Sequence, residues 1–236
     1  MSLNRQIFLT IILLIATILF FEYTNVDISL QNHFYNFETH KWLIDRNEPI
    51  LKFIFYNGIK KLLIIFAVCI LFSLLFFRKK RVIQEYKKGL ILVVLSAILI
   101  PVIVGSLKAT TNTPCPKNIE HFGGVYPDIK VLDSYPKDFK QNKKIKCWPA
   151  GHASGGFALL SLFFLFKSRK NRKRALALAM FVGWSMSLYK MFIGDHFLSH
   201  SIVTMEIAWL IVLILEKYLT HIFRKRSKNK NYDYYL

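Results

Sequence analysis

Acidic residues are scarce in this sequence. Its 236 residues include 14 aspartates and glutamates against 33 lysines and arginines, giving a net charge of +19 at neutral pH. Glycine-rich nucleotide-binding loops, internal repeats and low-complexity segments are also missing, which argues against a dinucleotide-binding domain and a repeat protein. The positive charge alone could favour nucleic acid, but its largest clusters flank apolar runs, where anionic lipid head groups account for them. We therefore expect no nucleic-acid partner.

Apolar residues, in contrast, make up 53% of the chain and aromatic residues 15%, which is high for a soluble domain. Six apolar runs approach the roughly 17–25 residues that a membrane-spanning helix needs. They lie at 7–21, 62–77, 89–104, 157–166, 175–192 and 202–218. The fourth run is the shortest and approaches this length only when extended back to Gly151. The sequence predicts an all-α integral membrane protein with about six transmembrane helices and a single domain over 1–236.

The first run lacks the features of a cleaved signal peptide. The segment before it, MSLNRQ, is weakly basic, and no small-x-small cleavage site follows Phe21. We expect a retained anchor helix.

Lysine and arginine cluster near the helix ends and set the orientation. With six crossings, the clusters at 78–81, 167–174 and 224–230 fall on one side, which the positive-inside rule identifies as the cytoplasm. Both termini are then cytoplasmic, and the tail over about 225–236 is expected to be disordered. The segments facing outward are about 22–61, 109–150 and 193–200.

Two outward segments are unusual. The segment 22–61 mixes aromatic and polar residues and is expected to lie along the membrane interface, either as part of a wall where lipid enters or as a brace. The segment 109–150 is rich in lysine. Its charge is either tolerated, because long loops translocate regardless of charge, or forms a collar that attracts an anionic substrate.

Ionisable residues gather at the predicted outer ends of the helices. A lysine at a helix end commonly snorkels, and a lone histidine commonly packs at an interface. Several such groups on one membrane face are costly, however, and indicate a functional site. They are Lys108, His152, Lys190, Asp195, His196 and His200.

Three motifs contain these residues: KATTNTPCP at 108–116, PAGH at 149–152 and KMFIGDH at 190–196. Their order and spacing resemble the signature of the type-2 phosphatidic acid phosphatases. That family has lysine, six residues and Arg-Pro; then Pro-Ser-Gly-His; then Ser-Arg, five residues, histidine, three residues and aspartate. The resemblance covers about residues 89–218 and implies a helical membrane bundle that binds lipid phosphates.

The sequence departs from this pattern at Cys115, Ala150, Tyr189–Lys190 and His200, which stand where the family has Arg, Ser, Ser-Arg and Asp. Two guanidinium groups are lost, and a lysine grips phosphate only as a point charge. The phosphate pocket is therefore expected to be built differently. The expected phosphate-binding residues are Lys108, Lys190, Thr111, Asn112 and the backbone at Gly151.

The resemblance also implies how the histidines divide the chemistry. His196 attacks phosphorus to form a phosphohistidine, and His152 protonates the leaving oxygen and later activates water. His200 takes the place of the orienting aspartate, and either Asp195 or Glu206 compensates for the lost charge. No cofactor is expected. A zinc site built from His152, His196, His200 and Asp195 is the competing account.

The segments NTPCP, GHASGGFAL and GDHFLSH are similar to the divergent branch that contains the bacterial lipid A 4′-phosphatases. This implies an enzyme of the bacterial inner membrane that removes a phosphate from lipid A on the periplasmic side. The alternatives within the class are lipid A 1-phosphate, undecaprenyl pyrophosphate and phosphatidylglycerol phosphate. A phosphotransferase and a non-catalytic membrane protein of the same fold also remain open.

The three cysteines differ in their surroundings. Cys69 lies within an apolar run and is expected to be a small packing residue. Cys115 and Cys147 bracket the same outward loop, each near a motif, so in an oxidising periplasm a disulfide would bring Lys108 and His152 together. The alternative is two free thiols.

Overall fold

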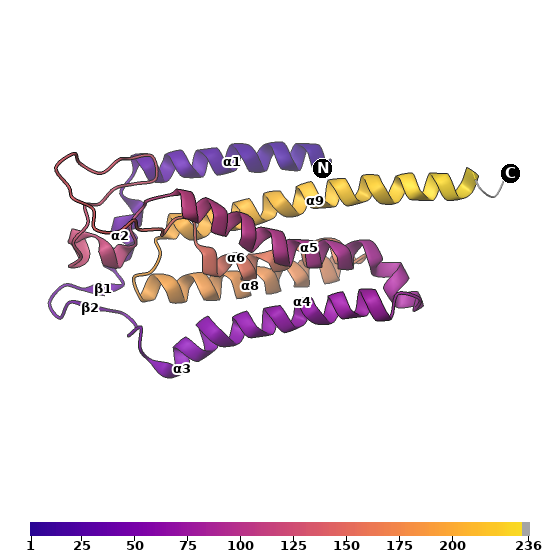
Figure 1. Cartoon of the computed structure of the whole chain (residues 1–236), viewed down its shortest axis with the longest axis horizontal. Helices are drawn as coiled ribbons and strands as arrows, with labels where there is room; N and C mark the ends of the chain where they lie inside the picture. The colour runs from indigo at the N-terminus through magenta and orange to yellow at the C-terminus, as the bar shows by residue number, and fades with distance from the viewer. Residues whose placement is uncertain (233–236) are drawn as a thin grey trace.

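Long helices run side by side along the molecule, as Figure 1 shows for the computed structural model, which describes residues 1–232. The helices are α1 (Leu3–Tyr23), α2 (Val26–Asn32), α3 (Pro49–Leu51), α4 (Ile59–Phe76), α5 (Arg81–Thr110), α6 (Gly151–Phe157), α7 (Leu162–Leu165), α8 (Arg169–Phe192) and α9 (Leu198–Tyr232). A π-helical turn, Lys52–Gly58, joins α3 to α4, and a 3₁₀ turn, Ala158–Ser161, joins α6 to α7. Short 3₁₀ turns also form at Pro116–Asn118 and Glu120–Phe122. Two strands, β1 (Tyr35–Asn36) and β2 (Lys41–Trp42), pair antiparallel.

Within the described residues, five helical segments are long and apolar enough to cross a membrane: Leu3–Tyr23, Pro49–Phe76, Arg81–Thr110, Arg169–Phe192 and Leu198–Lys225. The prediction of an all-α membrane protein is confirmed. In place of a sixth long helix, the structure has the shorter apolar segment Gly151–Leu165. This segment is largely buried among α5, α8 and α9, and the 3₁₀ turn within it rises more per residue than an α-helix.

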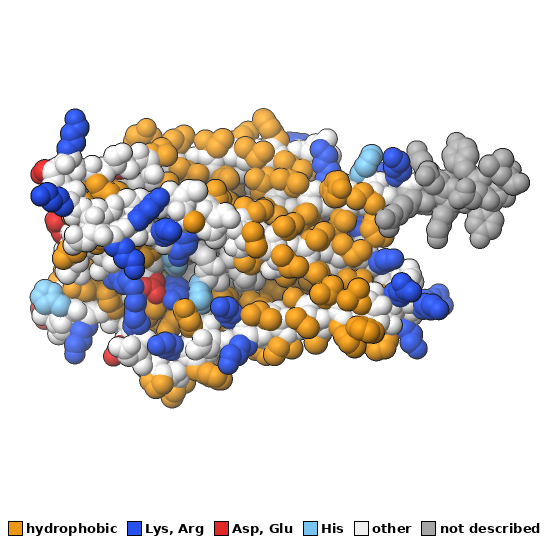
Figure 2. All heavy atoms as spheres, viewed as in Figure 1, with side chains coloured by type: hydrophobic (Ala, Val, Ile, Leu, Met, Phe, Trp, Pro, Cys, Tyr) orange, Lys and Arg blue, Asp and Glu red, His pale blue; other side chains and the backbone are white. Residues whose placement is uncertain are grey.

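The chain alternates direction along the bundle, so the start of α1 and the end of α9 point to the same end (Figure 1). The Lys and Arg clusters that join α4 to α5 and α7 to α8 lie at that end, which we call the basic end. The opposite end carries residues 24–48 and 111–150 and is called the loop end. Figure 2 shows a band of hydrophobic side chains between the charged ends. Such a band matches lipid, and the chain is a multi-pass membrane protein.

Helix α9 extends further than the sequence suggested. The tail from about residue 225 was expected to be disordered, but the structure continues as helix to Tyr232. Residues 224–232 contain neither glycine nor proline and are rich in lysine and arginine, which favour helix. Residues 233–236 lie outside the described part of the chain.

The first outward segment, 22–61, does not form one interfacial helix. It contains α2, the β1–β2 hairpin and α3, and the spanning segment already begins at Pro49. Proline suits the first turn of a helix, and the Glu48 carboxylate accepts a hydrogen bond from the Leu51 N–H at 2.6 Å. The hairpin instead packs Tyr35 and Trp42 against Phe122 of the second outward loop.

Helix α6 lies close to α8 because small residues face each other. A Cβ added at Gly156 would lie 2.8 Å from Gly183 Cα, and one added at Gly183 would collide with the Phe157 ring. Such glycine contacts let two helix backbones approach within a membrane. The close approach fixes the start of α6, which carries His152, relative to the end of α8, which carries Lys190.

Candidate active site

The three motifs meet at the loop end of the bundle. Lys108 lies in the last turn of α5, His152 in the first turn of α6, and Lys190 in the last turn of α8. His196 follows in the connection to α9, whose first turn contains His200. A Cβ added at Gly151 would lie 3.6 Å from Lys108 Cδ and 3.9 Å from its Nζ, so the ammonium group sits beside the start of α6.

A disulfide joins Cys115 to Cys147, whose Cα atoms lie 5.3 Å apart. It links the segment that follows Lys108 to the segment that precedes His152. The Cys147 N–H also donates to the Thr113 carbonyl at 3.1 Å. Cys69 is exposed on α4 and does not pack in the interior as the sequence suggested, because this face of α4 points away from the bundle.

Replacing Cys115 with serine should lower the free energy of unfolding by on the order of 3 kcal/mol, because the disulfide closes a long loop of the unfolded chain. The measurement is the midpoint of thermal unfolding of the protein in detergent. Cys69→Ser is the matched control and should leave the midpoint nearly unchanged. Equal midpoints for the two variants, or free thiols at both positions in unreduced protein, would contradict this expectation.

His196 and His200 lie against each other in the interior, with 3.3 Å between their Nδ1 atoms. Two imidazole nitrogens share a hydrogen bond only when one of them carries a proton. Burial lowers the pKa of His196 well below its ordinary value, and the charges of His200, Lys108, Lys190 and His152 lower it further. His196 is therefore neutral, and a proton on its Nδ1 leaves the lone pair on Nε2.

Asp195 binds three cations and neither imidazole. Its Oδ2 accepts a hydrogen bond from Lys190 Nζ at 2.9 Å, and its Oδ1 pairs with Lys117 Nζ at 2.8 Å and with Arg46. Burial acts to raise the pKa of the Asp195 carboxyl, but Lys190 and Lys117 outweigh it and hold the pKa below its ordinary value. Asp195 is therefore ionised, and its negative charge is paired with Lys190, Lys117 and Arg46.

Glu206, the other candidate for the missing aspartate, accepts a hydrogen bond from the Thr17 hydroxyl at 2.8 Å, which ties α9 to α1. In the described part of the chain, no carboxylate forms an ion pair with His196 or His200. The imidazole of His200 thus occupies the place beside His196 Nδ1 without supplying a negative charge.

Tyr56 connects His152 to Lys190 and was not anticipated from the sequence. The Tyr56 ring stacks on the His152 imidazole with 4.1 Å between the ring centroids. Lys190 Nζ lies 4.3 Å from the centroid of the same Tyr56 ring. His152 Nε2 is buried and has no hydrogen-bond partner among the residues that the structure describes. A buried nitrogen without a partner is costly, and a substrate oxygen would satisfy it.

Thr111 and Asn112 hold the second outward loop. The Thr111 hydroxyl donates to the Trp148 carbonyl, and the Asn112 and Gln141 amides exchange hydrogen bonds of 2.7 and 2.8 Å. The Ile145 N–H adds a third bond, at 3.0 Å, to Asn112 Oδ1. The side chains of Thr111 and Asn112, which the sequence assigned to phosphate, thus form hydrogen bonds with the second outward loop.

A cavity of about 520 Å³ opens beside His152. Its walls come from α4, α5 and α6 and are mostly aliphatic, with Leu63, Ala67, Val94 and Pro101 among them. Lys60 stands at its polar end together with His152. A cavity of this shape and composition suits a hydrocarbon chain whose polar group lies at the histidine.

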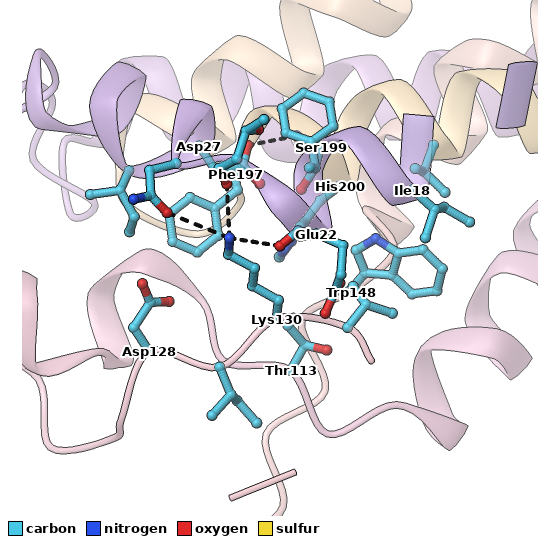
Figure 3. Close-up of a pocket in the computed structure, with 17 residues that line it drawn as sticks. Ile18, Glu22, Asp27, Thr113, Asp128, Lys130, Trp148, Phe197, Ser199 and His200 are labelled. Atoms are coloured by element: carbon cyan, nitrogen blue, oxygen red, sulfur yellow. Dashed lines mark hydrogen bonds between the residues drawn. The ribbon is translucent and has the colours of Figure 1, made fainter. Parts of the chain in front are cut away.

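A smaller cavity of about 40 Å³ lies on the other side of His200, between the second outward loop and α1, α2 and α9 (Figure 3). Lys130 Nζ donates to the carbonyls of Glu22 and Thr24 at 2.8 Å, and the Asp27 carboxylate accepts a hydrogen bond from the Ser199 N–H at 2.9 Å. Burial raises the pKa of Asp27 to about 6, against the lowering effect of Ser199. These contacts fix the start of α9 and hence His200.

The side chains do not suit zinc. In the described residues, the only group of three potential ligands is Cys147, His196 and His200, whose donor atoms lie within 4.8 Å of one another. Cys147 is oxidised in the disulfide and offers no thiolate, and Asp195 is taken up by cations. Two imidazoles are fewer ligands than a zinc site needs.

The family model described as the PAP2 superfamily matches residues 89–224, which include all three motifs. The chain belongs to the PAP2 superfamily. Members of this superfamily act on lipid phosphates in membranes.

This PAP2 protein is also similar to the lipid A 4′-phosphatase of Francisella tularensis subsp. novicida (strain U112), with 28% identity over 190 residues, covering 78% of this chain and 82% of that protein. No solved structure matches the chain. Arg46 and Tyr56 precede the part that the PAP2 model matches, so motif spacing alone does not reveal them.

Proposed function

We propose that this PAP2 protein is a phosphatase that removes a phosphate monoester from lipid A, at the 4′ position, through a phosphohistidine. The observation that carries the chemistry is the buried, neutral His196, whose Nδ1 is held by His200 at 3.3 Å among the lysines of the site. The choice of lipid A rests on the similarity to the Francisella enzyme.

In the first step, the lone pair of His196 Nε2 attacks phosphorus, and the bond from phosphorus to the lipid oxygen breaks. His152 gives its proton to that oxygen, so the lipid leaves as an alcohol. In the second step, a water oxygen attacks the phosphohistidine while His152 takes a proton from the water. The P–N bond breaks, and inorganic phosphate and free His196 result.

Lys108 and Lys190 neutralise the equatorial oxygens of the phosphoryl group during both steps, together with the backbone N–H at Gly151. Phosphoryl transfer depends mainly on positioning and on charge stabilisation. These lysines are therefore expected to stabilise the transition state most when they are held in position before the substrate binds. The stacking of Tyr56 on His152 and its contact with Lys190 support such an arrangement.

The bacterial inner membrane, with the loop end in the periplasm, is the location that we propose. The basic clusters lie at the opposite end of the bundle, as the positive-inside rule requires of a cytoplasmic face. The Cys115–Cys147 disulfide lies at the loop end and suits an oxidising compartment. The apolar cavity beside His152 supports a lipid as the substrate.

The lysine-rich second loop leads us to expect a preference for a bulky, multiply anionic glycolipid. In matched detergent micelles, the purified protein should release phosphate from lipid A at least about tenfold faster than from phosphatidic acid. The measurements are released phosphate and the product mass, with lipid A 1-phosphate, undecaprenyl pyrophosphate and phosphatidylglycerol phosphate as further substrates.

Equal turnover of lipid A and phosphatidic acid would overturn the lipid A assignment and leave a lipid phosphatase. Lipid product formed without an equal amount of inorganic phosphate would indicate transfer to another acceptor. If no lipid phosphate is turned over and His196→Ala behaves like the wild type, the protein is not catalytic.

A further inference from the structure

Three cations from separate parts of the chain converge on Asp195, the residue before His196. Lys190 Nζ and Lys117 Nζ lie 2.9 and 2.8 Å from its carboxylate oxygens, and the Arg46 guanidinium forms the third ion pair. Lys190 ends α8, Lys117 lies in the 3₁₀ turn after Cys115, and Arg46 lies between β2 and α3. One carboxylate thus faces three positive charges.

This surplus of positive charge lies in a partly enclosed place. The side chains of Lys190 and Asp195 are 9% and 16% exposed. Lys117 and Arg46 are more open, at 32% and 42%. Water screens the inner pair poorly, so the uncompensated charge produces a positive potential next to His196. An anion with more than one oxygen would balance it.

Backbone hydrogen bonds hold the segments that carry Lys117 and Arg46 against the turn that carries Asp195. The Lys117 N–H donates to the Gly194 carbonyl at 3.0 Å, and the Ile44 N–H donates to the Phe192 carbonyl at 3.3 Å. Gly194 has a φ of +71°, and a Cβ there would collide with the Trp42 ring, so the segment leading to Arg46 packs directly on this turn. The convergence is therefore built by the fold.

We propose that Arg46 and Lys117 bind the phosphoryl oxygens of the substrate, and that Asp195 holds them beside Lys190. This deepens the proposed function and rests on it. The two guanidinium groups expected from the motif pattern are missing at Cys115 and Lys190, and Arg46 supplies one from outside the matched region. A guanidinium donates two parallel hydrogen bonds to a phosphate, which lysine does not.

We call the group formed by Arg46, Lys117, Lys190 and Asp195 the phosphate cradle. Inorganic phosphate is the probe for this cradle, because its binding does not require turnover. The full-length protein in detergent is titrated with phosphate at low ionic strength, and the rise of the unfolding midpoint gives a dissociation constant. Arg46→Gln and Lys117→Gln should each weaken binding at least about tenfold, as the loss of a charge-assisted hydrogen bond predicts. Arg46→Lys should recover only part of the loss. Lys41→Gln, an exposed lysine of β2, is the matched control and should bind like the wild type.

Wild-type affinity in both glutamine variants, or an absent phosphate effect in the wild-type protein, would overturn the cradle. If Arg46→Gln does not fold, Arg46→Lys and Lys117→Gln carry the test. Turnover of lipid A is measured in parallel and separates the two proposals. Weakened phosphate binding without any turnover of lipid A rejects the substrate and leaves the cradle. Unchanged binding with turnover intact rejects the cradle and leaves the function.

Discussion

His196→Ala should abolish turnover of every substrate, with a loss of roughly 10⁴-fold or more, because no phosphoenzyme forms without the nucleophile. Released phosphate and a trapped phosphate label on the protein are the two measurements. In the wild type the label should be labile in acid and stable in base, as a phosphohistidine is. His33→Ala, an exposed histidine in the first outward segment, is the control and should retain both.

A label that persists in His196→Ala would assign the nucleophile to another residue. A chelator provides an independent test, since the proposed mechanism uses no metal and wild-type turnover should be unchanged in its presence. Complete inhibition that zinc restores would favour a metal centre over the two-histidine mechanism.

His152→Ala should have an effect that depends on the leaving group. A sugar hydroxyl leaves as a strong base and needs a proton, so turnover of a glycolipid phosphate should fall by roughly 10²- to 10⁴-fold. A nitrophenolate needs the proton much less, so phosphoenzyme formation from nitrophenyl phosphate should partly recover. The intermediate should then accumulate, because His152 is also the base for its hydrolysis. A burst of nitrophenol, followed by slow release, is the measurement.

Tyr56→Leu separates the chemistry of His152 from its packing. It removes the stacked ring but keeps the histidine, so it should lower both reactions alike and produce no burst. Equal losses with both leaving groups in His152→Ala, without a burst from a substrate that the wild type cleaves, would be incompatible with acid catalysis by this residue.

The positions of Lys108, His152, Lys190 and His196 were predictable because each stands at the end of an apolar run. Once those runs are helices that alternate across a membrane, their outer ends must share one face, and the structure places all four residues there. The same reasoning predicted an all-α membrane protein. It depends only on hydrophobic length and chain direction, which the sequence displays directly.

Arg46, Tyr56 and Lys117 were not predictable on that basis. Arg46 lies between β2 and α3, Lys117 in a short 3₁₀ turn and Tyr56 in the π-helical turn before α4, so each lies outside the three motifs or away from their titratable residues. Their contacts depend on how the hairpin, the loop and this turn pack. Thr111 and Asn112 show the converse difficulty, since their polar groups suited phosphate by type but are used by Trp148 and Gln141 of the loop. Partners of this kind are chosen by tertiary geometry, and residue type alone does not specify them.

The packing of Trp42 on Gly194 also sets how early the site can assemble during synthesis. Trp42 emerges early in synthesis, whereas Gly194 follows only after α8 has been inserted. Until then the hairpin has no Gly194 turn on which to dock, and Arg46 has no Asp195 with which to pair. The site is therefore among the last regions to mature, and a nascent chain that stalls within α8 would hold the earlier membrane helices while lacking both His196, the proposed nucleophile, and Asp195, the partner of Arg46.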